Sequence, residues 1–165
     1  MITIEALSQR DAKTLKDIRL RALQDTPSAF SSTYDKESRL SDAEWMERAT
    51  RWSRDRSVAY LAMDGTVACG IVAAFRDEQD EAHAYLVSMW VAPTHRRAGV
   101  GAALVHKILE WARTQNVRVM ELLVTSNNTP AIRFYERFGF AMTGKITPHA
   151  NDPSLSDCEM HRTVF

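Results

Sequence analysis

A glycine-rich turn flanked by arginines separates an apolar run from a helical pattern in the middle of the chain, and few backbone arrangements accommodate that order. Residues 85–91 are almost continuously apolar, which is typical of a strand buried on both faces. Beyond the turn, apolar residues recur at helical spacing from Val100 to Trp111. Gly99 and Gly101 allow the backbone to approach a ligand closely, and the free N–H groups of a first helical turn carry partial positive charge. The sequence therefore predicts an anion site, suited to phosphate, where this helix begins.

Two named phosphate motifs fit this turn poorly. The P-loop requires G-x-x-x-x-G-K followed by Ser or Thr, and the chain has no such stretch. The dinucleotide fingerprint requires a third small residue where this chain has Leu104, although Glu121 falls near the spacing of the acid that binds ribose. A Rossmann-type dinucleotide binder is therefore the weakest of the alternatives.

A second segment, further along the chain, limits the kinds of protein that the glycine turn can indicate. Residues 118–124 are predicted to form another strand, and a short helix should follow it. Asn128 or Thr129 can cap that helix, Pro130 suits its first turn, and Gly139 ends it.

These two segments resemble the cofactor motifs of the GNAT superfamily of acyl-CoA-dependent N-acetyltransferases. The pyrophosphate motif of that family, Q/R-x-x-G-x-G/A, is matched by residues 96–101. Its second motif, N-x-x-A-x-x-x-Y-x-x-x-G-F, is matched by residues 128–140. Many relatives carry glycine and a basic residue where this chain has Arg97 and Ala98, so one charge is displaced by a position.

The resemblance implies that acetyl-CoA is the acyl donor and that no metal takes part. The pantetheine arm of acetyl-CoA would lie between two splayed parallel strands and would bond to the backbone of Met89 and Val91. Asn128 would bond the pantetheine amide, a role compatible with that of a plain helix cap. The residues implied to hold the pyrophosphate are Arg96, Arg97, Gly99, Val100, Gly101 and Ala102.

Tyr135 matches the tyrosine that lies near the thioester sulphur in the family. A phenol with a pKa of ~10 can protonate the departing thiolate, whereas the alternative is that Tyr135 only packs against its aromatic neighbours. The sequence identifies the base that would deprotonate the amine less clearly, because this chain has Tyr85 near the place where many relatives carry a glutamate. Glu37 is the candidate base, with a solvated loop position as the alternative, and His149 is interpreted as a loop histidine.

The acceptor is expected to be a small-molecule amine or a peptide amine. Asp35, Glu37 and Asp152 are the carboxylates expected to face a cationic acceptor. Direct attack of the amine in a ternary complex is the leading mechanism. A catalytically silent acyl-CoA-binding module is the alternative, since the strand glutamate is missing.

Charge and composition restrict the partners. Lysine plus arginine and aspartate plus glutamate both number 21, so no global field favours nucleic acid or a membrane surface. No run of ~20 apolar residues predicts a transmembrane helix, and the first residues do not resemble a signal peptide, which favours a cytoplasmic protein. Cys69 and Cys158 are expected to be buried thiols, and a homodimer is compatible with the sequence.

Ser8 and Ser41 are predicted to cap the first two helices, and Asp64-Gly65 is the predicted turn between strands over residues 58–63 and 67–73. The predicted elements follow the order β-α-α-β-β-β-α-β-α-β-β. This order is typical of an α+β fold built around one mixed sheet. The resemblance implies that residues 1–165 form a single GNAT-like domain. Its sheet would be mostly antiparallel, with two splayed central parallel strands and flanking helices. A turn-rich loop over residues 147–156 should precede the last strand.

Overall fold

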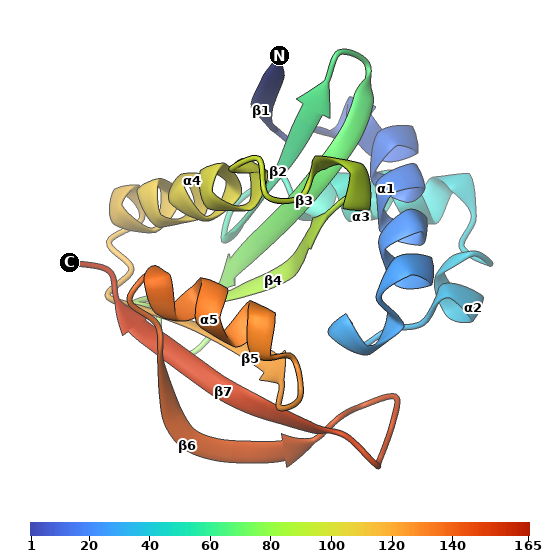
Figure 1. The fold of residues 1–165 in the computed structure, drawn as a ribbon. Helices are drawn as coiled ribbons and strands as arrows, with labels where there is room; N and C mark the ends of the chain where they lie inside the picture. The colour runs from blue at the N-terminus through green and yellow to red at the C-terminus, as the bar shows by residue number, and fades with distance from the viewer.

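The computed structural model describes residues 1–165, and its main elements follow the predicted order with short helical turns added (Figure 1). The strands are β1 (Ile2–Ala6), β2 (Ser57–Asp64), β3 (Val67–Arg76), β4 (His83–Val91), β5 (Val119–Thr125), β6 (Ala141–Pro148) and β7 (Ser156–Thr163). The helices are α1 (Ala12–Asp25), α2 (Tyr34–Glu37), α3 (Asp42–Arg51), α4 (Val100–Thr114) and α5 (Thr129–Arg137). Single 3-10 turns lie at η1 (Gln9–Asp11), η2 (Pro27–Ala29) and η3 (Pro93–His95).

One seven-stranded sheet runs through the molecule in the order β1-β2-β3-β4-β5-β7-β6. All neighbours are antiparallel except β4 and β5. These two strands pair only from His83 opposite Val119 to Tyr85 opposite Glu121, and then they diverge (Figure 1). The mixed sheet with splayed central strands is thus confirmed, and the doubly wound parallel sheet of a Rossmann binder is excluded.

The first hairpin confirms the predicted strands and moves the turn by one residue. Asp64 pairs with Val67, so the two turn residues are Gly65 and Thr66 rather than Asp64 and Gly65. Gly65 has φ +63°, a left-handed conformation that a hairpin turn of this length favours. Asp64 therefore completes β2.

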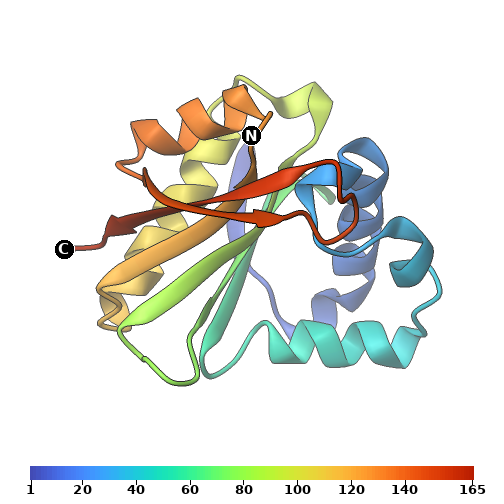
Figure 2. The ribbon, with the colours of Figure 1, turned by 90° about the horizontal axis from the view of Figure 1, so that it is seen from below.

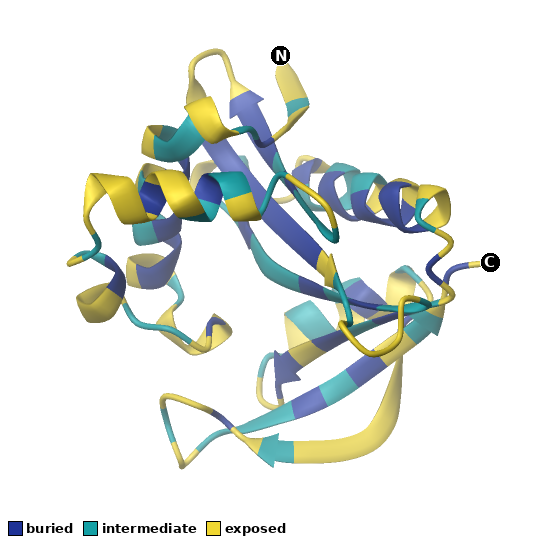
Figure 3. Cartoon of the chain, turned by 180° about the vertical axis from the view of Figure 1, so that it is seen from behind, coloured by how far each residue is buried: buried dark blue, intermediate teal, exposed yellow.

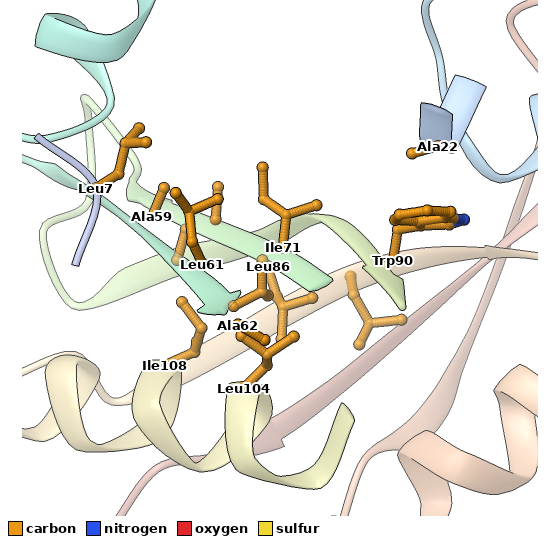
Figure 4. Close-up of a cluster of buried hydrophobic side chains, with 14 of the residues drawn as sticks. Leu7, Ala22, Ala59, Leu61, Ala62, Ile71, Leu86, Trp90, Leu104 and Ile108 are labelled. Atoms are coloured by element: carbon orange, nitrogen blue, oxygen red, sulfur yellow. The ribbon is translucent and has the colours of Figure 1, made fainter. Parts of the chain in front are cut away.

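The helices begin at the predicted polar residues. The backbone N–H of Ser8 donates to Asp11 Oδ2 (2.8 Å) ahead of α1, and Ser41 Oγ accepts from the Glu44 N–H (3.1 Å) ahead of α3. Apolar faces then pack on the sheet, and α4 does so through Leu104 and Ile108, which lie beside Ala62 of β2 (Figure 4). A Cβ at the neighbouring Gly70 of β3 would lie only 3.1 Å from Leu104 Cδ1. Helices cover both faces of β2 and β3, so these strands are buried on both sides (Figures 1 and 3). Cys69 and Cys158 are buried free thiols, as predicted.

A bulge interrupts β4, which the sequence had predicted as a regular strand. Ile71 of β3 pairs with Trp90, whereas Ala73 pairs with Val87, so β4 contains one extra residue. Ser88 lies in this bulge with φ +58°, a conformation that few non-glycine residues adopt. Bulges bend a strand and change the direction of its side chains, and this one lies where β4 leaves β5.

The loop between β6 and β7 folds back towards the segment after α1 (Figure 2). Asn151 Nδ2 donates to the carbonyl oxygens of Phe30 and Ser32, both at 2.9 Å. The predicted loop is therefore ordered by contacts with a segment that lies far from it in the sequence. β6 forms a largely exposed edge of the sheet (Figure 3), and no helix of the chain has the length and apolar character needed to cross a membrane.

Candidate active site

A cavity of about 360 Å³ opens where β4 and β5 diverge. Its walls are residues 85–89 of β4 and 121–125 of β5, and segment 28–31 contributes a further side. The other lining residues are Arg19, Phe75, Asn128, Ala131, Tyr135, His149 and Asp157. The residues come from both halves of the chain, so the cavity forms only when the sheet is complete.

Three residues predicted from the cofactor motifs line this cavity together. Met89 lies on β4, and Asn128 and Tyr135 lie at the start and in the last turns of α5. Asn128 Oδ1 accepts the Ala131 N–H (3.3 Å), which confirms the helix cap and leaves the side-chain amide hydrogens of Asn128 for a ligand.

Tyr135 both packs and borders the cavity. It is 8% exposed, and its ring contacts Phe134 and Phe140 in edge-on arrangements. Burial raises the pKa of the Tyr135 phenol above its usual value, so the hydroxyl remains protonated at neutral pH. The aromatic packing expected as an alternative therefore coexists with a hydroxyl that can donate a proton.

The glycine turn has the local geometry that an anion site requires. Gly99 has φ +83°, and its carbonyl oxygen accepts the Ala103 N–H at 3.0 Å, which is the first bond of α4. The preceding amides of Val100, Gly101 and Ala102 have no acceptor within the helix, as at any helix start. A Cβ on Gly99 would meet no atom within 4 Å, so its backbone is open to a ligand.

Gly101 serves a different purpose from Gly99. A Cβ there would lie 3.3 Å from the Met89 Cε and from the Phe134 ring, which is tighter than ordinary contact. The missing side chain therefore lets α4 approach β4 and α5 closely, and this approach joins the turn to the cavity wall.

Arg96 is held within the protein. Its Nε donates to the Val91 carbonyl oxygen (2.9 Å), and its guanidinium pairs with Asp25, which also accepts from Trp90 Nε1 (3.0 Å). Burial opposes ionisation of Asp25, but the hydrogen bonds from Trp90 and Arg96 keep the pKa of Asp25 below its usual value. Arg96 and the Val91 carbonyl thus anchor the turn to α1, whereas Arg97 is exposed with φ +61°.

Glu37 lies in a different environment from the one expected. It is 2% exposed on α2, so the solvated loop position considered for it is wrong. Both carboxylate oxygens are engaged: Arg19 donates to them through Nε and Nη2 at 2.9 Å, and Arg48 donates through Nη1 at 2.7 Å. Burial alone would raise the pKa of Glu37, yet these arginines hold that pKa below its usual value. Glu37 is absent from the cavity lining, and this geometry fits a positioning role rather than that of a base.

The residue that Glu37 positions is Arg19, which was not predicted as a site residue from the sequence. Arg19 lines the cavity, and its Nη1 donates to Ser88 Oγ in the β4 bulge (3.0 Å). Its guanidinium also lies 4.9 Å from the centre of the Phe30 ring. A signal was present, since Arg19 interrupts the apolar stripe of α1 at helical spacing between Leu15 and Leu23.

The carboxylates that line the cavity differ from those expected to face the acceptor. Asp35 is exposed and pairs with Arg39, and Asp152 lies in the β6–β7 loop, so neither lines the cavity. Glu121 and Asp157 line it instead. The sequence pattern relates Glu121 only to the spacing of the dinucleotide fingerprint, although a glutamate within an apolar strand is itself a signal.

Glu121 lies among groups that disfavour its charge. Burial and the neighbouring carboxylate of Glu159 raise the pKa of Glu121, while His83 Nε2, at 3.3 Å from Glu121 Oε1, opposes that effect. The adjacent Tyr85 hydroxyl donates to Asp77 Oδ2 (2.7 Å), and this bond raises the pKa of Tyr85 to about 12.

His149 is a buried residue rather than a solvated loop histidine. It is 6% exposed, and its Nδ1 lies 2.9 Å from Asp157 Oδ1. The two residues bracket the β6–β7 loop and lie at the cavity wall, next to the segment that Asn151 holds.

The chain belongs to the acetyltransferase (GNAT) family, whose model matches residues 19–140. It is 38% identical over 76 residues to an uncharacterized N-acetyltransferase from Methanocaldococcus jannaschii. That match covers 46% of this chain and 33% of the relative, so the chain aligns with about a third of that protein.

Solved structures agree with the fold over the full length. The chain resembles an acetyltransferase of the GNAT family from Streptococcus pneumoniae with a TM-score of 0.87, at 20% identity and covering 100% of both chains. It also resembles the PaiA N-acetyltransferase from Thermoplasma acidophilum, solved in complex with coenzyme A, with a TM-score of 0.78 at 18% identity and 99% coverage of both chains. At these identities the likeness establishes the fold.

Proposed function

We propose that this protein transfers an acetyl group from acetyl-CoA to a primary amine by direct attack within a ternary complex. The observation that carries the proposal is that Tyr135, Asn128 and the diverging edge of β4 at Met89 line one cavity. The acceptor is a small amine or an exposed peptide amine, because Glu121 and Asp157 give the cavity wall carboxylates that suit a cation.

The residues present fit acetyl-CoA. Three free amides begin α4, and the Gly99 backbone is open where a side chain would otherwise obstruct a pyrophosphate. Bound there, acetyl-CoA would supply an activated acyl group as a thioester. Beyond Tyr85 the edge of β4 that faces β5 has no paired strand, so its backbone is available to the pantetheine arm, and Asn128 can donate to the same arm.

Each catalytic role follows from the position of a side chain. Tyr135 remains protonated at neutral pH and can give its proton to the departing thiolate sulphur. Arg19 holds the bulge at Ser88, and the bulge sets the direction of the β4 backbone beside the reacting carbonyl. Glu37 keeps Arg19 in place through two hydrogen bonds.

The decisive experiment measures CoA thiol release with time over a panel of aliphatic amines, amino acids and N-terminal peptides. Calorimetry with acetyl-CoA is run on the same preparation. Binding together with amine-dependent release supports the proposal. Binding without release from any amine favours the silent acyl-CoA-binding module, and the absence of binding contradicts both.

A further inference from the structure

Glu121 occupies the last paired position of the two central strands. It lies opposite Tyr85, and beyond this pair β4 and β5 separate and the cavity opens. The side chain is 19% exposed and reaches the cavity wall rather than solvent at the molecular surface. A ligand between the strands would therefore meet this carboxylate at the closed end of the cleft.

The groups around Glu121 leave its charge without a strong partner. His83 Nε2 lies 3.3 Å from Glu121 Oε1, and the Tyr85 hydroxyl is committed to Asp77. His161 is its register partner on β7 but is exposed. No lysine or arginine forms an ion pair with Glu121, which is the opposite of the situation at Glu37.

Glu159 of β7 adds a second carboxylate beside Glu121, because it pairs with Leu123, two residues along β5, and therefore lies on the same face of the sheet. Its Oε2 accepts from the Thr143 hydroxyl (2.7 Å), and the exposed Lys145 lies 3.9 Å from its Oε1. Two half-buried carboxylates at close range favour either one shared proton or a bound cation. The cavity beside them supplies the space for that cation.

We propose that Glu121, with Glu159 beside it, receives the ammonium group of the acceptor and takes its proton. This assignment rests on the proposed acetyl transfer and names the base of that reaction. An aliphatic amine with a pKa of ~10 is almost entirely protonated at neutral pH, so the nitrogen cannot attack until a proton has left.

The protons balance over one turnover. An N–H bond of the ammonium breaks as an O–H bond forms on Glu121, and the freed electron pair of the nitrogen forms the bond to the acyl carbon. As the C–S bond breaks, Tyr135 gives its phenolic proton to the sulphur and regains one from the new amide nitrogen. Glu121 then releases its proton to solvent, so that one proton leaves for each amide formed.

The test compares the wild type with Glu121→Gln, Glu159→Gln and a control, Glu5→Gln, which changes an exposed strand glutamate at the other end of the sheet. Rates are measured from pH 5 to 10 with an aliphatic amine and with a weakly basic amine that is neutral at pH 7. Calorimetry with acetyl-CoA accompanies each variant.

We expect Glu121→Gln to lower kcat/KM for the aliphatic amine by about 10²-fold at pH 7, with recovery as the pH approaches the pKa of the free amine. The weakly basic amine should lose little, because its nitrogen needs no base. Glu159→Gln should move the acidic limb of the profile to lower pH, since Glu121 loses a repulsive neighbour. Glu5→Gln and all acetyl-CoA affinities should be unchanged.

Normal activity of a folded Glu121→Gln protein, or an equal loss with both amines, would overturn the assignment while leaving acetyl transfer itself intact. An unshifted acidic limb in Glu159→Gln would overturn it independently, even if Glu121→Gln did not fold. A wild type that releases no CoA with any amine contradicts the proposed function, and the assignment falls with it.

Discussion

Two glutamates near the cavity, the buried Glu37 and the half-buried Glu121, lie in opposite electrostatic surroundings. Glu37 accepts three hydrogen bonds from Arg19 and Arg48, and its pKa is lowered. Glu121 faces another carboxylate with only a histidine in opposition, and its pKa is raised. The first carboxylate is held in its charged form and orders the structure, whereas the second is available to exchange a proton.

The same contrast separates the two sides of the cavity. The cofactor side uses residues that are close in sequence, since the turn at 96–101 and the start of α5 each form within one short segment. The acceptor side collects Arg19, Glu121 and His149 from distant segments. Local patterns therefore predict the turn and the helix start of the first side, whereas the grouping of residues on the second side becomes visible only in the folded chain.

The largest expected effect is on the free energy of unfolding, and it tests the difference between Glu37 and Glu121. Glu37→Gln should lower the free energy of unfolding by about 3–5 kcal/mol at pH 7, because two arginines lose their buried partner. Glu121→Gln should leave stability unchanged or raise it, because the neutral side chain relieves the repulsion from Glu159. Urea unfolding of both variants measures the difference, and equal losses would contradict it.

The pH dependence of unfolding sharpens this test. Because the folded pKa of Glu37 is lowered, its contribution is present above the unfolded pKa of ~4.3 and is lost as the pH falls through the folded value. The wild type should therefore lose stability on acidification below about pH 4 more steeply than Glu37→Gln. Parallel curves would show that the ion pair contributes nothing.

The substitution Tyr135→Phe tests the cofactor side of the cavity through the turnover rate rather than through stability. Turnover should fall by about 10²-fold with little change in acetyl-CoA affinity, because the ring packing is retained and only the proton donor is lost. Steady-state kinetics and calorimetry on one preparation separate the two effects. Normal turnover would make Tyr135 a packing residue.

A matched glycine pair tests the turn that begins α4. Gly99 and Gly65 both have positive φ and open space where a Cβ would lie, so alanine at either should cost about 1–2 kcal/mol of stability through backbone strain. Only Gly99→Ala should also weaken acetyl-CoA, by roughly tenfold, because its methyl group enters the space required by the pyrophosphate. Equal affinities in the two variants would remove Gly99 from the site.

The smallest expected effect concerns the loop that borders the acceptor side. Asn151→Ala removes two hydrogen bonds to the segment at Phe30 and Ser32, which should cost about 1 kcal/mol in stability. The KM for the amine should rise a few-fold while acetyl-CoA affinity stays constant. A loss of affinity for both substrates would instead indicate a general loss of structure.

Predictions that depended on local pattern were confirmed most closely. The apolar spacing of α4, the caps of α1 and α3, and the Asn128 cap of α5 all follow from neighbouring residues. The errors lie where distant strands set the geometry. The turn at Gly65 and Thr66 depends on the register of β2 and β3, and the bulge at Ser88 depends on that of β3 and β4.

The amino-acid sequence was sufficient for the order of the elements, the glycine turn that begins α4 and the resemblance to the GNAT family, because helical periodicity, caps and glycine turns act over a few residues. The folded chain was needed to establish that Glu37 is a buried partner of Arg19 and that Glu121 lies near Glu159 of β7. The charge state of a carboxylate depends on what folding brings within a few ångströms of it, and sequence spacing does not contain that distance.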